Sequence, residues 1–202
     1  MLDYTDFLTI KRNSESLFKD KRSKHFGYSF RINSKEEAKS IIDQLRIENP
    51  KCNHVCYAYR LIENEQLIEF STDDGEPSNS AGAPILGQLK SKKHFNTLVA
   101  VVRYFGGTKL GISGLINAYK TTAADVLDLS ESMTYSVNYL VTISLDSKLL
   151  GTILSFLSRQ DISIINQTYS NLHEITVHTN SSELERIKTK FGTIVQIEWE
   201  KK

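Results

Sequence analysis

The chain has 202 residues, of which 40% are hydrophobic and 24% charged, as in a globular protein with one large or two small domains. Its 25 basic and 24 acidic residues give a net charge of +1, which excludes strong long-range attraction to nucleic acid or acidic membranes. No apolar run spans about 18 residues, no signal peptide is evident, and two cysteines cannot make a disulfide framework, so we expect a cytoplasmic protein without membrane spans.

The first part of the chain predicts a mixture of strands and helices. A hairpin is expected over residues 15–19 and 24–32, with its turn in the basic segment that contains Lys21 and Arg22. Ser34 and Glu37 have the spacing of a capping box and predict the start of a helix, which ends at Pro50. Strands are further expected at 54–61, 67–72 and 97–102, and helices at 80–89 and 115–129.

The pattern changes around residues 130–134, and a simpler order follows. Asp146 or Ser147 is expected to cap a helix that runs through residue 158, and Ser182 with Glu185 predicts a second capping box. Strands are predicted at 138–145, 162–167, 173–178 and 193–199. The order β-α-β-β-α-β is that of a ferredoxin-like domain. We therefore predict an α+β protein with two domains, residues 1–133 and 134–202.

Seven of the ten glycines lie between residues 75 and 114, and six of these fall in two blocks, residues 71–84 and 103–114, on either side of the predicted buried strand 97–102. Glycine is used where the backbone has positive φ or approaches another group closely. The second block, here called the glycine loop, connects a strand to a helix, where backbone N–H groups can bind phosphate. The alternative, that its glycines serve only a tight turn and close packing, stays open. Its candidate phosphate- or nucleic-acid-binding residues are Arg103, Tyr104, Gly106, Gly107, Lys109, Gly111 and Gly114.

The first block contains Asp73, Asp74, Gly75 and Glu76, here called the acidic loop. Three carboxylates within four residues could bind a divalent cation. The commoner use is a turn whose carboxylates accept backbone N–H groups and favour a helix N-terminus. We expect the turn, and the cation site stays open as the alternative. The secondary candidates for the site are His54, Arg60, Lys21 and Arg22.

Cys52, His54 and Cys56 do not predict a metal site. In an extended strand they would point the same way but lie too far apart for tetrahedral ligation, and no second cysteine pair supplies further ligands. Cys56 is expected to be buried as a small apolar residue. No nucleophilic triad can be assembled from the spacing, and no cofactor is predicted.

Several long segments occur in an order that resembles the IMPACT family, specifically its bacterial YigZ-like branch. They cover most of residues 15–130 and lie at 19–24, 34–38, 54–60, 71–78, 81–86, 101–111 and 114–115. Asn79 stands where that family usually has glycine, and Ile112-Ser113 replaces a small residue and a glycine. The resemblance implies an N-terminal domain of the ribosomal-protein-S5 domain-2-like type, a mixed sheet with helices on one side, and a ferredoxin-like C-terminal domain.

The resemblance also implies an association with translation control and no established catalysis. We therefore predict a non-catalytic regulator or binding protein that contacts RNA, the ribosome or a translation factor through the two loops, without DNA sequence specificity. The alternative is an enzyme acting on a phosphorylated small molecule, in which the acidic loop holds a metal while Arg103 and Lys109 bind the phosphate. A pocket that joins the carboxylates to the glycine loop would favour the enzyme, and a flat basic face would favour binding.

Overall fold

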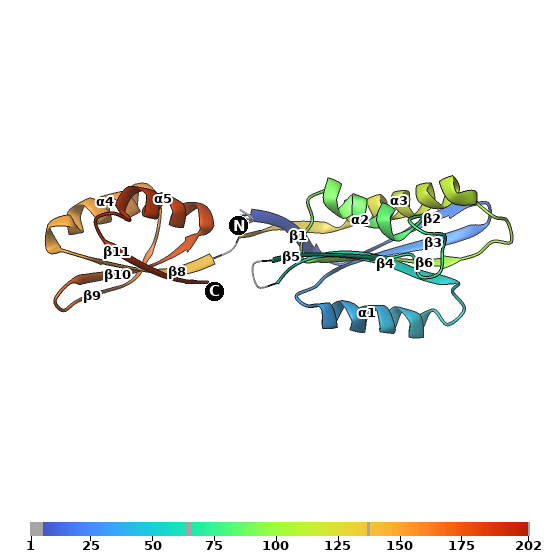
Figure 1. Ribbon diagram of the computed structural model, residues 1–202, viewed down its shortest axis with the longest axis horizontal. Coiled ribbons are helices and arrows are strands. Elements are labelled where there is room, and N and C mark those ends of the chain that lie inside the picture. Colours follow the sequence, from blue (N-terminus) through green and yellow to red (C-terminus); the bar gives the residue numbers. More distant parts are fainter. Residues whose placement is uncertain (1–5, 64–65, 137, 202) are drawn as a thin grey trace. The chain divides into compact units, whose positions relative to one another are not determined.

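The computed structural model describes residues 6–63, 66–136 and 138–201, and its chain divides into two compact units. The first unit runs over Phe7–Tyr135, and the second contains the chain from Ser136 onward (Figure 1). Each unit has its own hydrophobic core. The predicted α+β class is confirmed. The elements of the first unit are β1 (Asp6–Arg12), β2 (Ser14–Asp20), β3 (Ser23–Arg31), α1 (Lys35–Glu48), β4 (His54–Glu63), β5 (Gln66–Thr72), α2 (Gly82–Ser91), β6 (Thr97–Tyr104), α3 (Gly111–Leu129) and β7 (Glu131–Ser136).

The first unit is built on a five-stranded sheet in the order β2-β3-β6-β4-β5, with every neighbouring pair antiparallel. Helices α2 and α3 cover one face and α1 covers the other (Figure 1). The expected mixed sheet with helices on one side is therefore wrong. Consecutive residues of β6 are apolar and buried, and because they point to alternate faces, both faces need a helical cover.

The predicted hairpin and the first helix are confirmed. Lys21 and Arg22 form the turn between β2 and β3 with φ of 43° and 68°, as a tight two-residue hairpin turn requires. Ser34 Oγ accepts the N–H of Glu37 at the start of α1. Strands β1 and β7 were not predicted, and they pair with each other in a separate two-stranded sheet. Helix α3 begins at Gly111, four residues before the predicted start.

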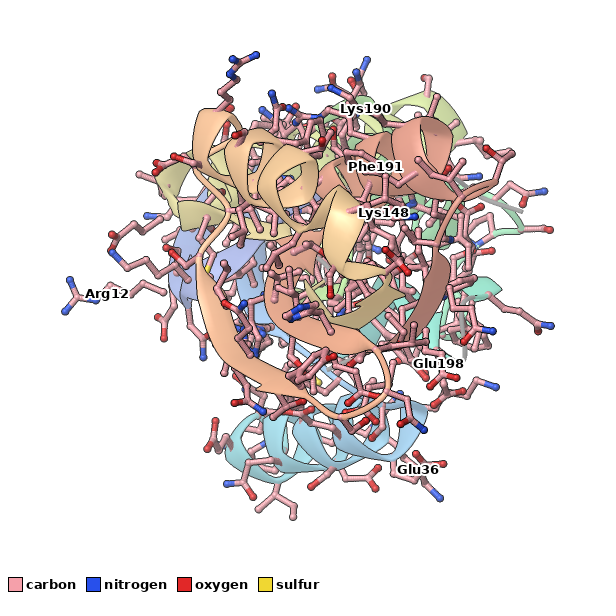
Figure 2. All side chains as sticks on the ribbon, turned by 90° about the vertical axis from the view of Figure 1, so that its left-hand side faces the viewer. Arg12, Glu36, Lys148, Lys190, Phe191 and Glu198 are labelled. Atoms are coloured by element: carbon pink, nitrogen blue, oxygen red, sulfur yellow. The ribbon has the colours of Figure 1, made fainter. Side chains whose placement is uncertain are left out.

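The second unit has the predicted ferredoxin-like order. Its four strands form an antiparallel sheet in the order β11-β8-β10-β9. Of the neighbouring residues Lys190 and Phe191, both labelled in Figure 2, Phe191 is buried in the core of this unit and Lys190 is exposed. The elements are β8 (Asn138–Leu145), a 3-10 turn (Ser147–Leu149), α4 (Leu150–Arg159), β9 (Ile164–Tyr169), β10 (His173–Asn180), α5 (Ser181–Phe191) and β11 (Gln196–Lys201).

Local details of the second unit correct the sequence-based expectations. Asn180, not Ser182, caps α5, because the extended end of β10 places its side chain 2.9 Å from the N–H of Glu183. The Glu183 carboxylate accepts the N–H of Asn180 in return, at 2.8 Å. Asp146 caps the 3-10 turn before α4 by accepting the N–H of Lys148. Strands β9 and β11 begin two and three residues later than predicted.

Candidate functional site

Asp73 holds the acidic loop closed. Its Oδ1 accepts the N–H groups of Ala81 and Gly82, at 2.9 and 2.8 Å, and its Oδ2 accepts that of Asn79 at 2.8 Å. Burial alone would raise the pKa of Asp73, but these three N–H groups outweigh it and hold the pKa below its ordinary value. Asp73 thus caps the start of α2, in the turn role that the sequence favoured.

Asp74 ties the acidic loop to α1 and β4. Its Oδ1 lies 2.7 Å from Arg46 Nη2, and its Oδ2 accepts the N–H of Val55 at 2.6 Å. The Asp74 carbonyl lies 2.7 Å from His54 Nδ1, so this nitrogen carries the donating hydrogen. Both carboxylate oxygens of Asp74 therefore have partners within the protein.

Glu76 is buried against Arg103 and Tyr119. Its Oε1 lies 2.5 Å from Arg103 Nη1 and accepts the Tyr119 hydroxyl at 2.8 Å, while His54 Nε2 stays 3.8 Å away. Cys56 Sγ lies 3.3 Å from the Tyr119 oxygen. Together with His25 these side chains make up what is here called the buried network: His25, His54, Cys56, Glu76, Arg103 and Tyr119.

The buried network is organised by strand register. His25 of β3 and His54 of β4 both lie opposite Arg103 of β6, so the three side chains form a row across the sheet. His25 is fully buried with its ring edge-on to Tyr119 at 5.3 Å. Burial, helped by the Arg103 charge, lowers the pKa of His25 to about 4, so its imidazole is neutral at neutral pH. Burial raises the pKa of Cys56 and of Tyr119.

The glycine loop packs directly on the β2–β3 turn. A Cβ at Gly106 would lie 2.1 Å from the backbone carbon of Arg22, and the Gly106 N–H donates to Ser23 Oγ at 3.1 Å. Gly107 has φ of 85°, in the region that favours glycine. Tight turning and close packing therefore both operate here. Lys109 of the glycine loop and Lys21 of the turn on which this loop packs are both exposed.

The candidate cations fall into different environments. Arg103 is buried in its pair with Glu76, so of the two expected phosphate contacts Lys109 is the exposed one. Arg60 lies at the opposite end of β6 from Arg103, facing Thr97, and bonds Glu69 at 2.9 Å. It is thus not brought together with the two loops.

Two further sequence expectations concern the backbone around the acidic loop. Cys56 is fully buried as predicted, but Cys52 packs with the core under α1, on the other face from Cys56, because β4 begins only at His54. Asn79 has φ of 60°, a left-handed conformation that asparagine adopts more readily than most residues. The departure from glycine at this position is therefore accommodated.

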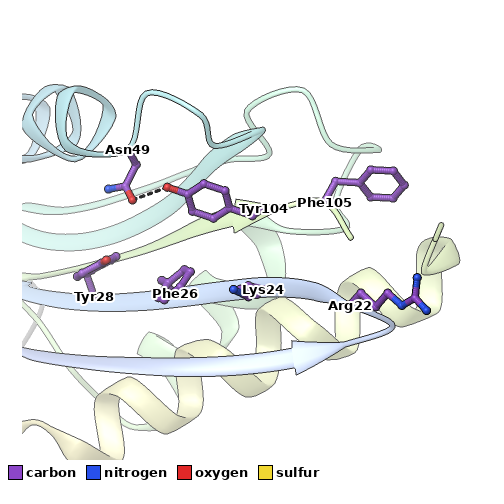
Figure 3. A pocket seen from close by; sticks show the side chains of 7 residues that line it. All are labelled: Arg22, Lys24, Phe26, Tyr28, Asn49, Tyr104 and Phe105. Atoms are coloured by element: carbon purple, nitrogen blue, oxygen red, sulfur yellow. Dashed lines mark hydrogen bonds between the residues drawn. The ribbon is translucent and has the colours of Figure 1, made fainter. Parts of the chain in front are cut away.

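A pocket of about 380 Å³, here called the aromatic pocket, opens on the α1 side of the sheet (Figure 3). It does not join the carboxylates of the acidic loop to the glycine loop. The sequence interpretation missed this pocket, although alternating aromatic residues in 24–30 gave a signal for it. It is lined by Arg22, Lys24, Phe26, Tyr28, Asn49, Tyr104 and Phe105.

The described part of the chain also bears on metal binding and on membrane insertion. Across residues 6–63, 66–136 and 138–201, no three His, Cys, Asp or Glu side chains are grouped so that they could hold a metal ion. No helix in this part of the chain combines the length and apolar character needed to cross a membrane.

Known proteins resemble the chain in sequence and in fold. The Impact N-terminal domain family matches residues 21–127. IMPACT family member YvyE of Bacillus subtilis is 30% identical over 177 residues, which are 88% of this chain and 81% of that protein. IMPACT family member YigZ of Escherichia coli is 41% identical over 86 residues, 42% of each chain.

A crystal structure described as a hypothetical protein matches with a TM-score of 0.65 at 24% identity, over 96% of each chain, which shows a shared fold. Because the family match spans more than half of the chain and the Bacillus relative aligns with most of it, this chain belongs to the IMPACT family, as its motifs predicted.

Proposed function

We propose that this chain is a non-catalytic, translation-associated binding protein that contacts RNA, the ribosome or a translation factor through the acidic loop and the glycine loop. One observation carries the proposal: all three carboxylates of the acidic loop already bond to protein donors. Asp73 bonds three backbone N–H groups, Asp74 bonds Arg46 and Val55, and Glu76 bonds Arg103 and Tyr119.

This engagement argues against the alternative enzyme. A carboxylate that binds a cation or moves a proton must offer oxygen lone pairs toward a substrate, whereas these oxygens stabilise the loop itself. Exposed basic side chains lie at this end of the sheet, namely Lys21 and Arg22 in the turn and Lys109 in the loop packed on it. Exposed cations in loops suit contacts to the phosphates of an RNA backbone.

The test is filter binding of RNA and sedimentation with ribosomes, measured across a salt series. Lys109→Ala should weaken association and reduce the slope of log affinity against log salt by about 0.7 to 0.9. Lys39→Ala, an exposed lysine on α1, is the matched control and should behave as the wild type. No salt-dependent association of intact protein at near-physiological ionic strength, or turnover of a phosphorylated metabolite lost in folded Asp74→Asn protein, would contradict the proposal.

A further inference from the structure

On the α1 side of the sheet, the aromatic residues of β3 pack beside the core under α1 but are only partly buried. Helix α1 packs against β4 and β6, and Phe26 and Tyr28 of β3 stay half-buried as walls of the aromatic pocket. These residues alternate along β3 with His25, which points to the buried network on the opposite face. The aromatic pocket is therefore separate from the acidic loop.

The aromatic walls are fixed in place by the fold. Phe26 and Tyr104 meet edge to face, with centroids 5.8 Å apart and planes at 83°. The Tyr104 hydroxyl donates to Asn49 Oδ1 at 2.8 Å, and the Asn49 amide donates to the Leu45 carbonyl at 2.9 Å. The end of α1 thus holds the Tyr104 ring, so a flat ligand would meet a surface that loses little freedom on binding.

The charges around the aromatic pocket are arranged along its length. Arg22 lies at the end that carries Phe105, and Asn49 and Tyr28 lie at the other end (Figure 3). Arg22 and Lys24 are exposed, and neither forms an ion pair within the described ranges. Glu15 of β2 lies opposite Tyr28 in the register. The pocket therefore presents a cationic end beside aromatic faces.

We propose that the aromatic pocket binds one nucleotide, with its base stacked on the aromatic rings that line the pocket and its phosphate held by Arg22 and Lys24. Aromatic faces flanked by cations bind unstacked bases with little sequence preference, and 380 Å³ is at the small end of ligand pockets. The nucleotide could be free or part of a single strand, but a duplex offers no unstacked base. Binding of a strand rests on the proposed function, whereas binding of a free nucleotide does not.

The experiment measures fluorescence anisotropy with a labelled eight-nucleotide single-stranded RNA and with a duplex of the same sequence. Phe105→Ala should weaken single-strand binding about tenfold, and Lys24→Ala should reduce the salt slope by about 0.7. Phe70→Ala and Lys120→Ala are the matched controls, because Phe70 is 40% exposed and Phe105 44%, and both Lys24 and Lys120 are exposed. Circular dichroism checks that each variant is folded.

A calorimetric titration with AMP distinguishes a free nucleotide from a nucleotide within a single strand. AMP binding that Phe105→Ala abolishes supports the aromatic pocket even if no RNA associates, in which case the RNA arm of the proposed function fails alone. If RNA binds but the Phe105 and Lys24 variants keep the wild-type affinity and salt slope, the pocket proposal is overturned and the proposed function stands. Equal binding of the single strand and the duplex also overturns the pocket proposal. If neither RNA nor AMP binds, the pocket proposal and the RNA arm of the proposed function are both overturned.

Discussion

Arg103 and Glu76 form an ion pair in which Nη1 and Oε1 are 2.5 Å apart and the two side chains are only 7% and 4% exposed. The Tyr119 hydroxyl donates to the same Glu76 oxygen. Two opposite charges can be buried together because each compensates the other, and removing one leaves the other buried without a partner. The pair therefore stabilises the acidic loop against the middle of the sheet.

Replacing Glu76 with alanine should lower the free energy of unfolding by about 3 to 5 kcal/mol, since it leaves the Arg103 guanidinium buried and unpaired. Urea denaturation followed by circular dichroism measures the change. Glu131→Ala is the control, because both side chains of the Lys11–Glu131 pair are more than half exposed, so solvent screens the pair and its loss should change the stability far less. Equally small losses of stability in both variants would contradict the expectation that the buried pair stabilises the fold more than the exposed pair.

The fully buried His25 should make the protein less stable in mild acid. Its pKa is about 4 in the folded protein, below the ordinary 6.5, so as the pH falls from 6.5 to 4 the unfolded chain takes up a proton and the native state does not. Stability should therefore fall with pH across this window, by up to about 3 kcal/mol, and the loss is complete below it. His25→Phe should reduce this dependence, and the part that stays is expected from His94, whose pKa is also lowered by burial. Urea unfolding at several pH values gives the stability of the wild type and of the variant. If both lose the same stability between pH 6.5 and 4, His25 is not the cause of the loss.

Gly106→Ala should distort the contact between the glycine loop and the β2–β3 turn. The added Cβ would lie 2.1 Å from the carbon of Arg22 and 2.3 Å from the nitrogen of Ser23, which are backbone atoms. We expect a loss of about 1 to 3 kcal/mol in thermal or urea unfolding, as for an overpacked site. Gly87→Ala, in α2 with nothing within 4 Å of the added carbon, should be neutral or stabilise by up to about 1 kcal/mol. The same small change of stability in both variants would argue against close packing of Gly106 on the backbone of the β2–β3 turn.

Residues 134–202 expressed alone should fold, which tests the proposed boundary near residue 133. This segment contains a closed hydrophobic core with buried residues from β8, β10 and both helices, such as Ile143, Ile153, Val177 and Ile187. Thermal melting followed by circular dichroism should be cooperative. A gradual, non-cooperative transition would place the boundary elsewhere.

Hydrophobic periodicity and capping signals predicted most elements, and the ferredoxin-like order followed from them. They could not choose between overlapping signals: Asn180 with Glu183 and Ser182 with Glu185 both have capping-box spacing, and the end of β10 decides between them. Strands β1 and β7 escaped prediction because their pairing joins segments more than a hundred residues apart.

The candidate site was only partly predictable for a similar reason. Asp73 acts in the expected turn, because its partners lie within nine residues of it. Arg103 was expected at a phosphate, but its partner Glu76 comes from a different loop that only the folded sheet brings near. Tyr119 lies on the apolar face of α3, where a sequence pattern cannot distinguish a network residue from an ordinary core residue.

The central position of β6 has a consequence for the order in which the chain acquires structure. It is the last of the five strands to leave the ribosome, yet Val102 pairs with both Phe26 and Val55, so β6 joins the hairpins β2–β3 and β4–β5. Isolated hairpins are marginally stable in water. A nascent chain that has not reached residue 104 therefore carries two unstable hairpins with open edges. Such long-range closure slows folding, and a chain stopped before this strand is prone to aggregate.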